Sequence, residues 1–233
     1  MTTEEVHIKI KNILNKLDSH DYDNIESWQI NSAFNIAQLT WVRRNLHGAN
    51  YFREGDESSK IRIDDFQVLL HDVDLSLQKK DKYYEAYPLP ANYFMFKRLD
   101  VKAKKGCCDE QDMIVYLAEH ANISLILNDD FRKPSFEWRE TICTLKENKI
   151  QIWTNNEFDI SKATLVYYIL PPEIRLAGAY DINTQQIATT TVNPIFKDDV
   201  VELLINEASK LLASNIELVN QINIQSNQTE QNN

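Results

Sequence analysis

The sequence predicts an α+β fold, with N-terminal helices, a β-rich middle platform and a long C-terminal amphipathic helix. Two patterns carry this prediction: apolar residues recur with a period of about 3.6 near both ends of the chain and of about two in between. The chain has 233 residues, of which 43% are hydrophobic and 26% are charged. This composition is typical of a globular protein whose core needs no disulfides.

Residues 1–48 are the predicted N-terminal helical segment. Thr2 and Glu5 have the spacing of a capping box, and a short amphipathic helix follows them. A second helix is expected from about Glu26 to His47. Its apolar residues fall in two stripes, and a helix that is apolar on two sides needs a neighbour on each.

Residues 61–195 are the predicted β-rich domain. Alternating apolar residues predict strands in DVDLSLQ (72–78) and FMFKRLDVKAK (94–104), and ANISLILND (121–129) is a further strand candidate. A hairpin is expected in ETICTLKENKIQIWT (140–154), with its turn at Glu147 and Asn148.

The least polar stretch of the chain reads ISKATLVYYILPP, residues 160–172. It predicts a strand that is covered on both faces, as a central strand is. Pro171 and Pro172 end this strand because proline has no N–H for the ladder. Tyr167 and Tyr168 are therefore expected to pack rather than to take part in catalysis.

Residues 198–220 are the predicted C-terminal helix, which we expect to pack with the N-terminal helices. Asp198 and Asp199 place negative charge at its start, where the helix dipole favours it. Residues 221–233 form a polar tail rich in Asn and Gln, which is expected to be disordered in isolation.

Composition argues against several classes of function. The formal net charge of −10 disfavours a protein that grips nucleic acid, because phosphate binding needs a surface of Lys and Arg. Four glycines in the whole chain leave no glycine-rich phosphate loop, and no cofactor is expected. The three cysteines, an odd number that includes an adjacent pair, indicate a reducing compartment.

The chain is expected to act away from membranes. Its longest apolar run falls far short of the roughly 20 residues that a membrane-spanning helix needs. The N-terminal MTTEEVHIKIKNILNKL lacks the basic and apolar regions of a secretion signal.

Two clusters of residues raise the question of a catalytic or metal site. Paired carboxylates can hold Mg²⁺ in a metal-dependent enzyme. If the segment is an alternating strand, Asp72 and Asp74 share the face opposite the apolar residues. A solvated strand face is therefore the favoured interpretation of these two acids. The acids are Asp64, Asp65, Asp72 and Asp74, with His71 among them.

The second cluster consists of thiols and one histidine. Zinc sites normally separate paired ligands by two to four residues, a gap that adjacent cysteines lack, so neither a zinc site nor an activated thiol is expected. The residues are Cys107, Cys108, His120 and Cys143.

Apolar helix faces that need partners are the remaining candidate sites. On the C-terminal helix, Leu204, Ala208 and Leu211 are expected to face protein, either in the same chain or in a neighbouring one. The full set of interface candidates is Trp28, Phe34, Trp41, Leu204, Ala208 and Leu211.

The order of several segments resembles that of a known family of virion proteins. LPANYFMFKRLDV is followed by P.FEWRETICTL, NKIQIWTN and FDISKATLVYYILPPEIRL, and then by TVNPIFKDDVVELLINEASKLLASNIELVNQ. Across more than half of the chain, from Leu89 to Gln221, this order is similar to that of the head-to-tail connector or adaptor proteins of short-tailed, crAss-like bacteriophages. The resemblance is one of overall pattern rather than of a single diagnostic motif.

The resemblance implies a structural protein without catalytic residues. It implies a ring of about twelve copies, closed by heterologous contacts, at the junction of head and tail. Its partners would be the portal protein and other tail ring proteins, with viral DNA passing through without specific binding. Such a protein is made in the bacterial host cytoplasm and ends up in the virion. The alternatives are another tail or capsid-associated protein and, less favoured, an enzyme using the four acids named above.

Overall fold

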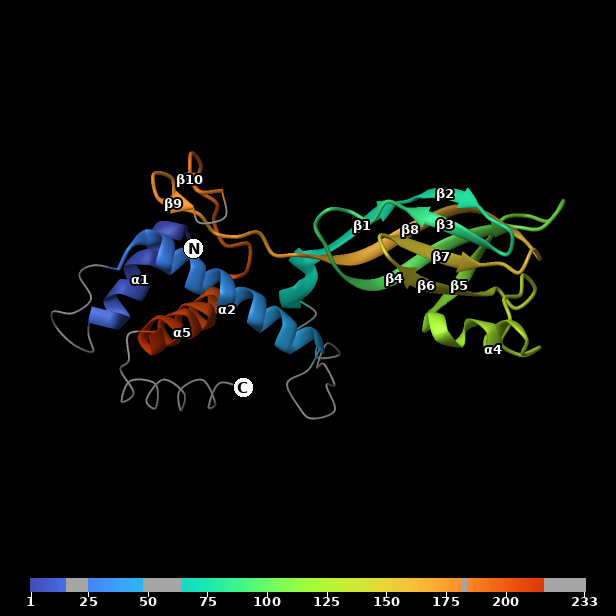
Figure 1. Ribbon diagram of the computed structural model, residues 1–233, viewed down its shortest axis with the longest axis horizontal. Helices are drawn as coiled ribbons and strands as arrows, with labels where there is room; N and C mark the ends of the chain where they lie inside the picture. The colour runs from blue at the N-terminus through green and yellow to red at the C-terminus, as the bar shows by residue number, and fades with distance from the viewer. Residues whose placement is uncertain (16–24, 48–63, 182–183, 216–233) are drawn as a thin grey trace. The chain divides into compact units, whose positions relative to one another are not determined.

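The computed structural model describes residues 1–15, 25–47, 64–181 and 184–215 of the chain. It is a mixed α/β structure with one large β-sheet and several helices, one of them C-terminal (Figure 1). The chain divides into two compact units, Leu69–Leu170 and the combination of Met1–Val68 with Pro171–Asn233. We call the first the sheet unit and the second the helical unit. The predicted polar tail, 221–233, lies outside the described residues.

The sheet unit is shorter than the predicted β-rich range of 61–195. Residues from Pro171 onward belong to the helical unit instead. In the described residues between Pro171 and 195, the strands are only two residues long: β9 (Tyr180–Asp181) pairs with β10 (Gln186–Ile187). The prolines at 171 and 172 end the long ladder, and the chain then packs on helices.

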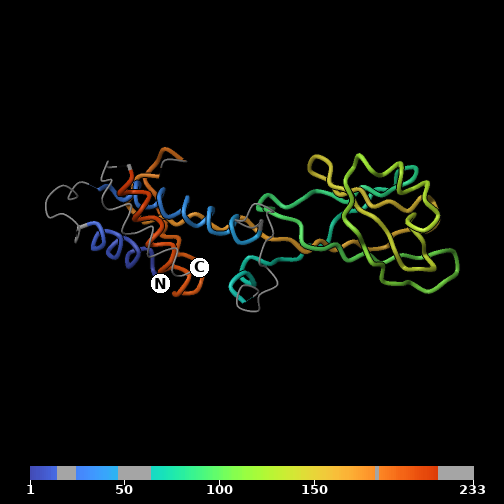
Figure 2. The backbone as a smooth tube through the Cα atoms, turned by 90° about the horizontal axis from the view of Figure 1, so that it is seen from below, coloured from blue at the N-terminus to red at the C-terminus, as the bar shows by residue number. Residues whose placement is uncertain are grey.

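Three helices form the core of the helical unit: α1 (Thr3–Asn15), α2 (Ser27–His47) and α5 (Asp198–Asn215). Figures 1 and 2 show the start of the chain and α5 in this same unit, and α5 contacts both other helices. The side chains with no exposed surface lie where these helices meet. They are Val6, Ile10 and Leu14 of α1, Ile30, Phe34, Ala37 and Val42 of α2, and Val201, Ile205, Ala208 and Ala213 of α5.

The capping box at the start of α1 is present as predicted. The Thr2 amide donates to Glu5 Oε2 over 2.9 Å, and the Glu5 amide donates to Thr2 Oγ1 over 3.2 Å. Each side chain thus satisfies an amide that the first helical turn leaves without a partner. The next residue, Thr3, is fully buried and donates from Oγ1 to the carbonyl of Val192 over 2.7 Å, which fixes α1 to the segment before α5.

Polar side chains of α2 hold the segment that follows the two prolines. Asn35 Oδ1 accepts a 2.8 Å hydrogen bond from the amide of Ile174, whose side chain is fully buried. Gln38 Nε2 donates to the carbonyl of Pro172 over 3.0 Å. These bonds satisfy backbone groups that have no sheet partner, so an irregular segment can be buried against a helix.

The sheet unit is built on eight strands in the order β1-β8-β4-β5-β6-β7-β3-β2. All neighbours are antiparallel except β5 and β6, which are parallel. The strands are β1 (Leu70–Asp74), β2 (Ser76–Lys79), β3 (Tyr83–Tyr87), β4 (Tyr93–Lys104), β5 (Gln111–Leu117), β6 (Glu140–Lys146), β7 (Lys149–Trp153) and β8 (Asp159–Ile169).

The sheet rolls up, because its two edge strands are consecutive in the chain. Only Leu75 separates β1 from β2, although they stand at opposite ends of the strand order. The Leu75 amide donates to the carbonyl of Ala163 in β8 over 2.9 Å, and its side chain is buried. One chain segment therefore joins both ends of the sheet. The hydrophobic core inside it includes Leu99, Val101, Ile150, Ile152 and Leu165.

The least polar stretch forms a strand, β8, with hydrogen-bonded neighbours on both sides. It pairs with β1 and with β4. The prediction that both of its faces are covered is wrong for its first half, where Ser161 and Lys162 are exposed beside buried Ile160 and Ala163.

The tyrosine pair lies in the second half of β8. Tyr167 is buried, stacks on Tyr93 with ring centroids 5.9 Å apart and donates to Asn92 Oδ1 over 3.2 Å. Tyr168 is also buried. Both tyrosines pack, and the strand ends at Ile169, before the two prolines.

The predicted hairpin is confirmed, and one predicted strand is wrong. β6 and β7 pair in the expected register, with Lys146 opposite Lys149 and Glu147 at a positive φ of 55° in the turn. The stretch 121–129, however, contains the short helix α4 (Ile123–Leu127) after the 3₁₀ turn η2 (His120–Asn122). The parallel pairing of β5 and β6 explains this difference, since parallel strands need a crossover connection, which is usually helical.

Leu204→Asp should unfold the helical unit. The Leu204 side chain is 1% exposed among the three helices, so the substitution leaves an unpaired carboxylate in an apolar core. We expect a loss of at least about 3 kcal/mol in the free energy of unfolding, measured by urea denaturation and circular dichroism. Asn206→Asp adds the same charge at an exposed position of α5 and is the control. Equal stability of the two variants would contradict the packing described here.

His7 should make the helical unit less stable in mild acid. It is 6% exposed, and its Nε2 donates to Asn31 Oδ1 over 2.7 Å. Burial lowers the pKa of His7 below its ordinary value of 6.5, and nearby Lys11 lowers it further against the effect of the hydrogen bond.

Because the pKa of His7 is lower in the folded chain, the unfolded chain binds the proton first as the pH falls below about 6.5. The free energy of unfolding should therefore decrease from that pH downward to the lowered pKa. Urea denaturation at a series of pH values measures this slope. His7→Gln should flatten the slope in this window, and an unchanged slope would show that other groups are responsible.

Candidate assembly surfaces

Three of the six predicted interface residues lie inside the chain's own core. Phe34 and Ala208 have no exposed surface and Leu204 has 1%. They stabilise the packing of α2 with α5 rather than a contact with another chain. For Leu204 and Ala208, the protein that was expected to cover them is part of the same chain.

Trp41 also packs within the helical unit rather than against another chain. Its ring stacks on Phe66 at a centroid distance of 5.1 Å and meets the edge of Phe196 at 5.3 Å. The two remaining candidates, Trp28 and Leu211, are half-buried and line a groove on the surface of the helical unit. Only these two of the six thus remain candidates for a contact at the surface.

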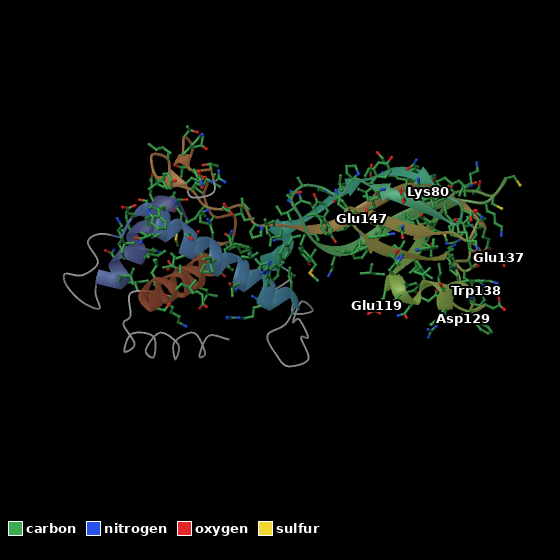
Figure 3. The ribbon with its side chains drawn as sticks, viewed as in Figure 1. Lys80, Glu119, Asp129, Glu137, Trp138 and Glu147 are labelled. Carbon is green, nitrogen blue, oxygen red and sulfur yellow. The ribbon has the colours of Figure 1, made fainter. Side chains whose placement is uncertain are left out.

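Among the described residues, the most exposed large apolar side chains lie outside the predicted set of six. They lie on the crossover between β5 and β6, where Phe131 is 94% exposed, Trp138 76% and Leu125 73%. We call these three residues the crossover hydrophobics. Figure 3 shows Trp138 on the side of the sheet unit that carries α4, near Asp129 and Glu137. Aromatic residues among charges in the turn-rich segment NDDFRKPSFEWRE were the available signal.

Buried residues on either side anchor this crossover. Ile123 of α4 and Phe136 are each 5% exposed, and the ring of Phe136 lies 6.1 Å from that of Phe158 in the core. Ser135 and Glu140 exchange backbone hydrogen bonds of 2.9 and 3.0 Å. The exposed residues therefore sit on a connection that is fixed to the sheet, so binding a partner costs little ordering entropy.

Charged residues of both signs flank the crossover hydrophobics. Lys133 pairs with Asp130 at 2.6 Å and Arg132 with Asp129 at 3.9 Å. Side chains that are apolar at the centre and charged at the rim match the anatomy of protein–protein interfaces.

The four acids of the alternative metal site belong to different parts of the fold. Asp64 and Asp65 are in the helical unit, where Lys197 pairs with both. Burial raises the pKa of Asp65, and the nearby Asp199 raises it further. Across the described ranges, no three His, Cys, Asp or Glu side chains come together in a way that could hold a metal ion.

The other two acids lie on β1 of the sheet unit. Asp74 accepts hydrogen bonds from Thr164 at 2.5 Å and Lys162 at 2.9 Å on the neighbouring strand, and these partners lower its pKa. Asp72 is exposed opposite Val166. Cross-strand pairing accounts for Asp74, and Asp72 occupies the same solvated face of the strand.

The thiols are likewise divided between surface and core. Cys107 and Cys108 are exposed between β4 and β5, whereas Cys143 on β6 has no exposed surface. Burial raises the pKa of Cys143 to about 12. His120 is exposed in η2. Cys143 is thus a packing residue with an unreactive thiol.

Most of the negative charge lies outside the sheet unit. The sequence of the helical unit carries the larger part of the formal charge of −10, while acids and bases nearly balance in the sheet unit. Two lysines at the end of β4 and just after it are paired with acids: Lys102 lies 3.9 Å from Glu110, and Lys105 lies 3.1 Å from Glu157.

No protein-family model matches the chain, and no curated protein matches it. Among the described residues, no helix is both long and apolar enough to cross a membrane.

The three thiols should react in two classes. A chromogenic disulfide reagent at about pH 8 should label Cys107 and Cys108 in the folded chain, because only a trace of Cys143 is thiolate when its pKa is about 12. Denaturant should release the third thiol. Cys143→Ala is the control: it should leave labelling of the folded chain unchanged and abolish the extra reaction. Rapid native labelling of all three thiols would refute the burial of Cys143.

Proposed function

We propose that this chain is a structural subunit of a bacteriophage virion that assembles into an oligomeric ring at the junction of head and tail. The observation that carries the proposal is the exposure of the crossover hydrophobics on an anchored connection. Exposed aromatic residues held in place are the usual centres of binding energy in protein interfaces. The sequence pattern from Leu89 to Gln221 supports the particular kind of assembly.

The proposed contact is between copies of this chain and is heterologous, so that one surface meets a different surface on the next copy. Such contacts close into a ring when the rotation between copies allows it. Burying one aromatic side chain contributes about 1.5–3 kcal/mol, so two aromatic residues supply a useful part of the affinity between neighbours.

The charge of the chain fits a passage for DNA that does not bind it. An excess of acidic residues repels phosphates, and Lys102 and Lys105 each pair with a carboxylate. The portal protein and other tail ring proteins are the proposed neighbours above and below the ring, and the virion is the proposed location.

Removing the two aromatic side chains should disrupt the assembly. For Phe131→Ser combined with Trp138→Ser we expect association between copies to weaken at least about 100-fold, because truncating a central aromatic residue commonly costs 2 kcal/mol or more. Light scattering after size exclusion, together with electron microscopy of particles, measures the assembly state.

Ile187→Ser is the matched control, because Ile187 is 67% exposed on β10 and belongs to the helical unit rather than to the crossover. It should assemble like the unaltered chain. Rings that form normally from the double variant would refute the role of the crossover hydrophobics. Absence of the chain from purified virions would refute the proposed function as a whole.

A further inference from the structure

Strand β5 exchanges one neighbour for another halfway along its length. Its first residues, 111–113, pair with β4, and that ladder ends where Val101 lies opposite Met113. Its last residues, 114–117, pair with β6 on the other side. In the described pairings no strand lies beside residues 114–117 on the β4 side. We call this side of residues 114–117 the β5 edge.

The hydrogen bonds of β5 show which backbone groups this edge presents. The amides of Ile114 and Ala118 donate to carbonyls of the β6 segment over 2.7 and 2.9 Å. Backbone groups alternate in direction along a strand, so Val115 and Leu117 point away from β6. For the N–H and C=O of these two residues, the described part of the chain supplies no hydrogen-bond partner.

The side chains along the β5 edge are apolar and exposed. Ile114 is 55% exposed and Tyr116 52%, and these two share one face of the strand. Leu117, on the other face, is 50% exposed. Residues 113–118 read MIVYLA and contain no charge. The edge therefore offers both backbone groups and apolar surface to a partner.

The two outermost strands of the sheet carry the charges that the β5 edge lacks. Strand β1 includes Asp72 and Asp74, and β2 ends in Lys79. Charged side chains on an edge strand hinder its pairing with another chain. Their absence from the β5 edge indicates that a further strand pairs there.

A second copy of the same edge has the matching length and register. In an antiparallel pair centred on Tyr116, Val115 of each copy lies opposite Leu117 of the other, and each such pair exchanges two hydrogen bonds. Ile114 then lies opposite Ala118. The pairing stops there on both copies, because β4 occupies the edge from Met113 backward and the chain turns into η2 after Ala118.

The chemistry of the edge also favours a copy of itself. Each exposed apolar side chain meets an apolar one across the pair: Tyr116 meets Tyr116, and Leu117 meets Val115. A charged side chain at these positions of a partner would lose water without gaining an opposite charge. Acids and bases nearly balance in the sheet unit, so two copies approach here without strong repulsion.

We propose that the β5 edges of two copies pair antiparallel around Tyr116 and join the two sheets. This contact is isologous, so by itself it joins two copies only. It uses a different surface from the crossover hydrophobics and does not rest on the proposed ring.

Single cysteines on the edge test the register. Cys107→Ser and Cys108→Ser first remove the exposed thiols, and the buried Cys143 stays. Tyr116→Cys should then link two copies, because residues opposite each other without hydrogen bonds have Cα atoms about 4.5 Å apart, within reach of a disulfide. Ile114→Cys is the control: it lies on the same face, but its two copies would be at least roughly 13 Å apart.

Under mild oxidation, Tyr116→Cys should form disulfides between chains at least about ten times faster than Ile114→Cys, at a rate that rises with protein concentration. Non-reducing electrophoresis and mass spectrometry of the linked peptides report this. Equal rates for the two variants would overturn the proposal, whether another protein covers the edge or none does.

Leu117→Lys tests the contact without a crosslink. The new charge should block pairing, and the chain should still fold because Leu117 is half exposed. Ile187→Lys adds the same charge to the helical unit and is the control. Both are made in the chain with Phe131→Ser and Trp138→Ser, so that the proposed ring contact does not contribute.

Sedimentation velocity over a series of concentrations should show a species of two copies for the control and its loss for Leu117→Lys. A control that stays monomeric, or a pair that survives Leu117→Lys, would overturn the proposal. Either result would leave the ring untouched, since the ring is tested by its own variants and by the content of virions.

Discussion

The antiparallel pairing of β1 with β8 is the constraint on which the rest of the structure depends. Leu70 lies opposite Tyr168, and Asp74 lies opposite Thr164. The chain enters the sheet unit at β1 and leaves it after β8, so this pairing holds the entry and the exit on adjacent strands. Because of it, segments far apart in the sequence can supply a single helical core.

The parallel pairing of β5 with β6 is the second constraint, and it determines which residues the sheet unit presents. A rolled sheet whose ends share one chain segment has few free edges for another chain to extend. The crossover that parallel strands require must run over the outside of the sheet, and it is the place where Phe131 and Trp138 are held out of the core. The parallel order of β5 and β6 thus determines that these two aromatic residues are exposed on the sheet unit.

Features that depend on local residue chemistry could be predicted from the sequence. The cap formed by Thr2 and Glu5, the turn at Glu147 and the start of α5 at Asp198 each follow from a few neighbouring side chains. The apolar run of α4 was mistaken for a strand because a short apolar run fits either structure, and only the distant pairing of β5 with β6 decides between them.

Other features could not be predicted, because they depend on which part of the chain meets which. The apolar patterns around Phe34 and Leu204 predicted that other parts of a protein would cover these side chains. Only the fold shows that they are buried where α2 packs against α5. Phe131 belongs to no periodic pattern, so its exposure had no signature beyond an aromatic ring among charges.

The division of the helical unit between both ends of the chain has a consequence for biosynthesis. The sheet unit is one continuous segment, Leu69–Leu170, and can fold as soon as it has left the ribosome. The apolar faces of α1 and α2 must wait for α5, which is translated after the whole sheet unit. A chain cut short before Asp198 would expose those faces and would become a target for cellular chaperones and proteases.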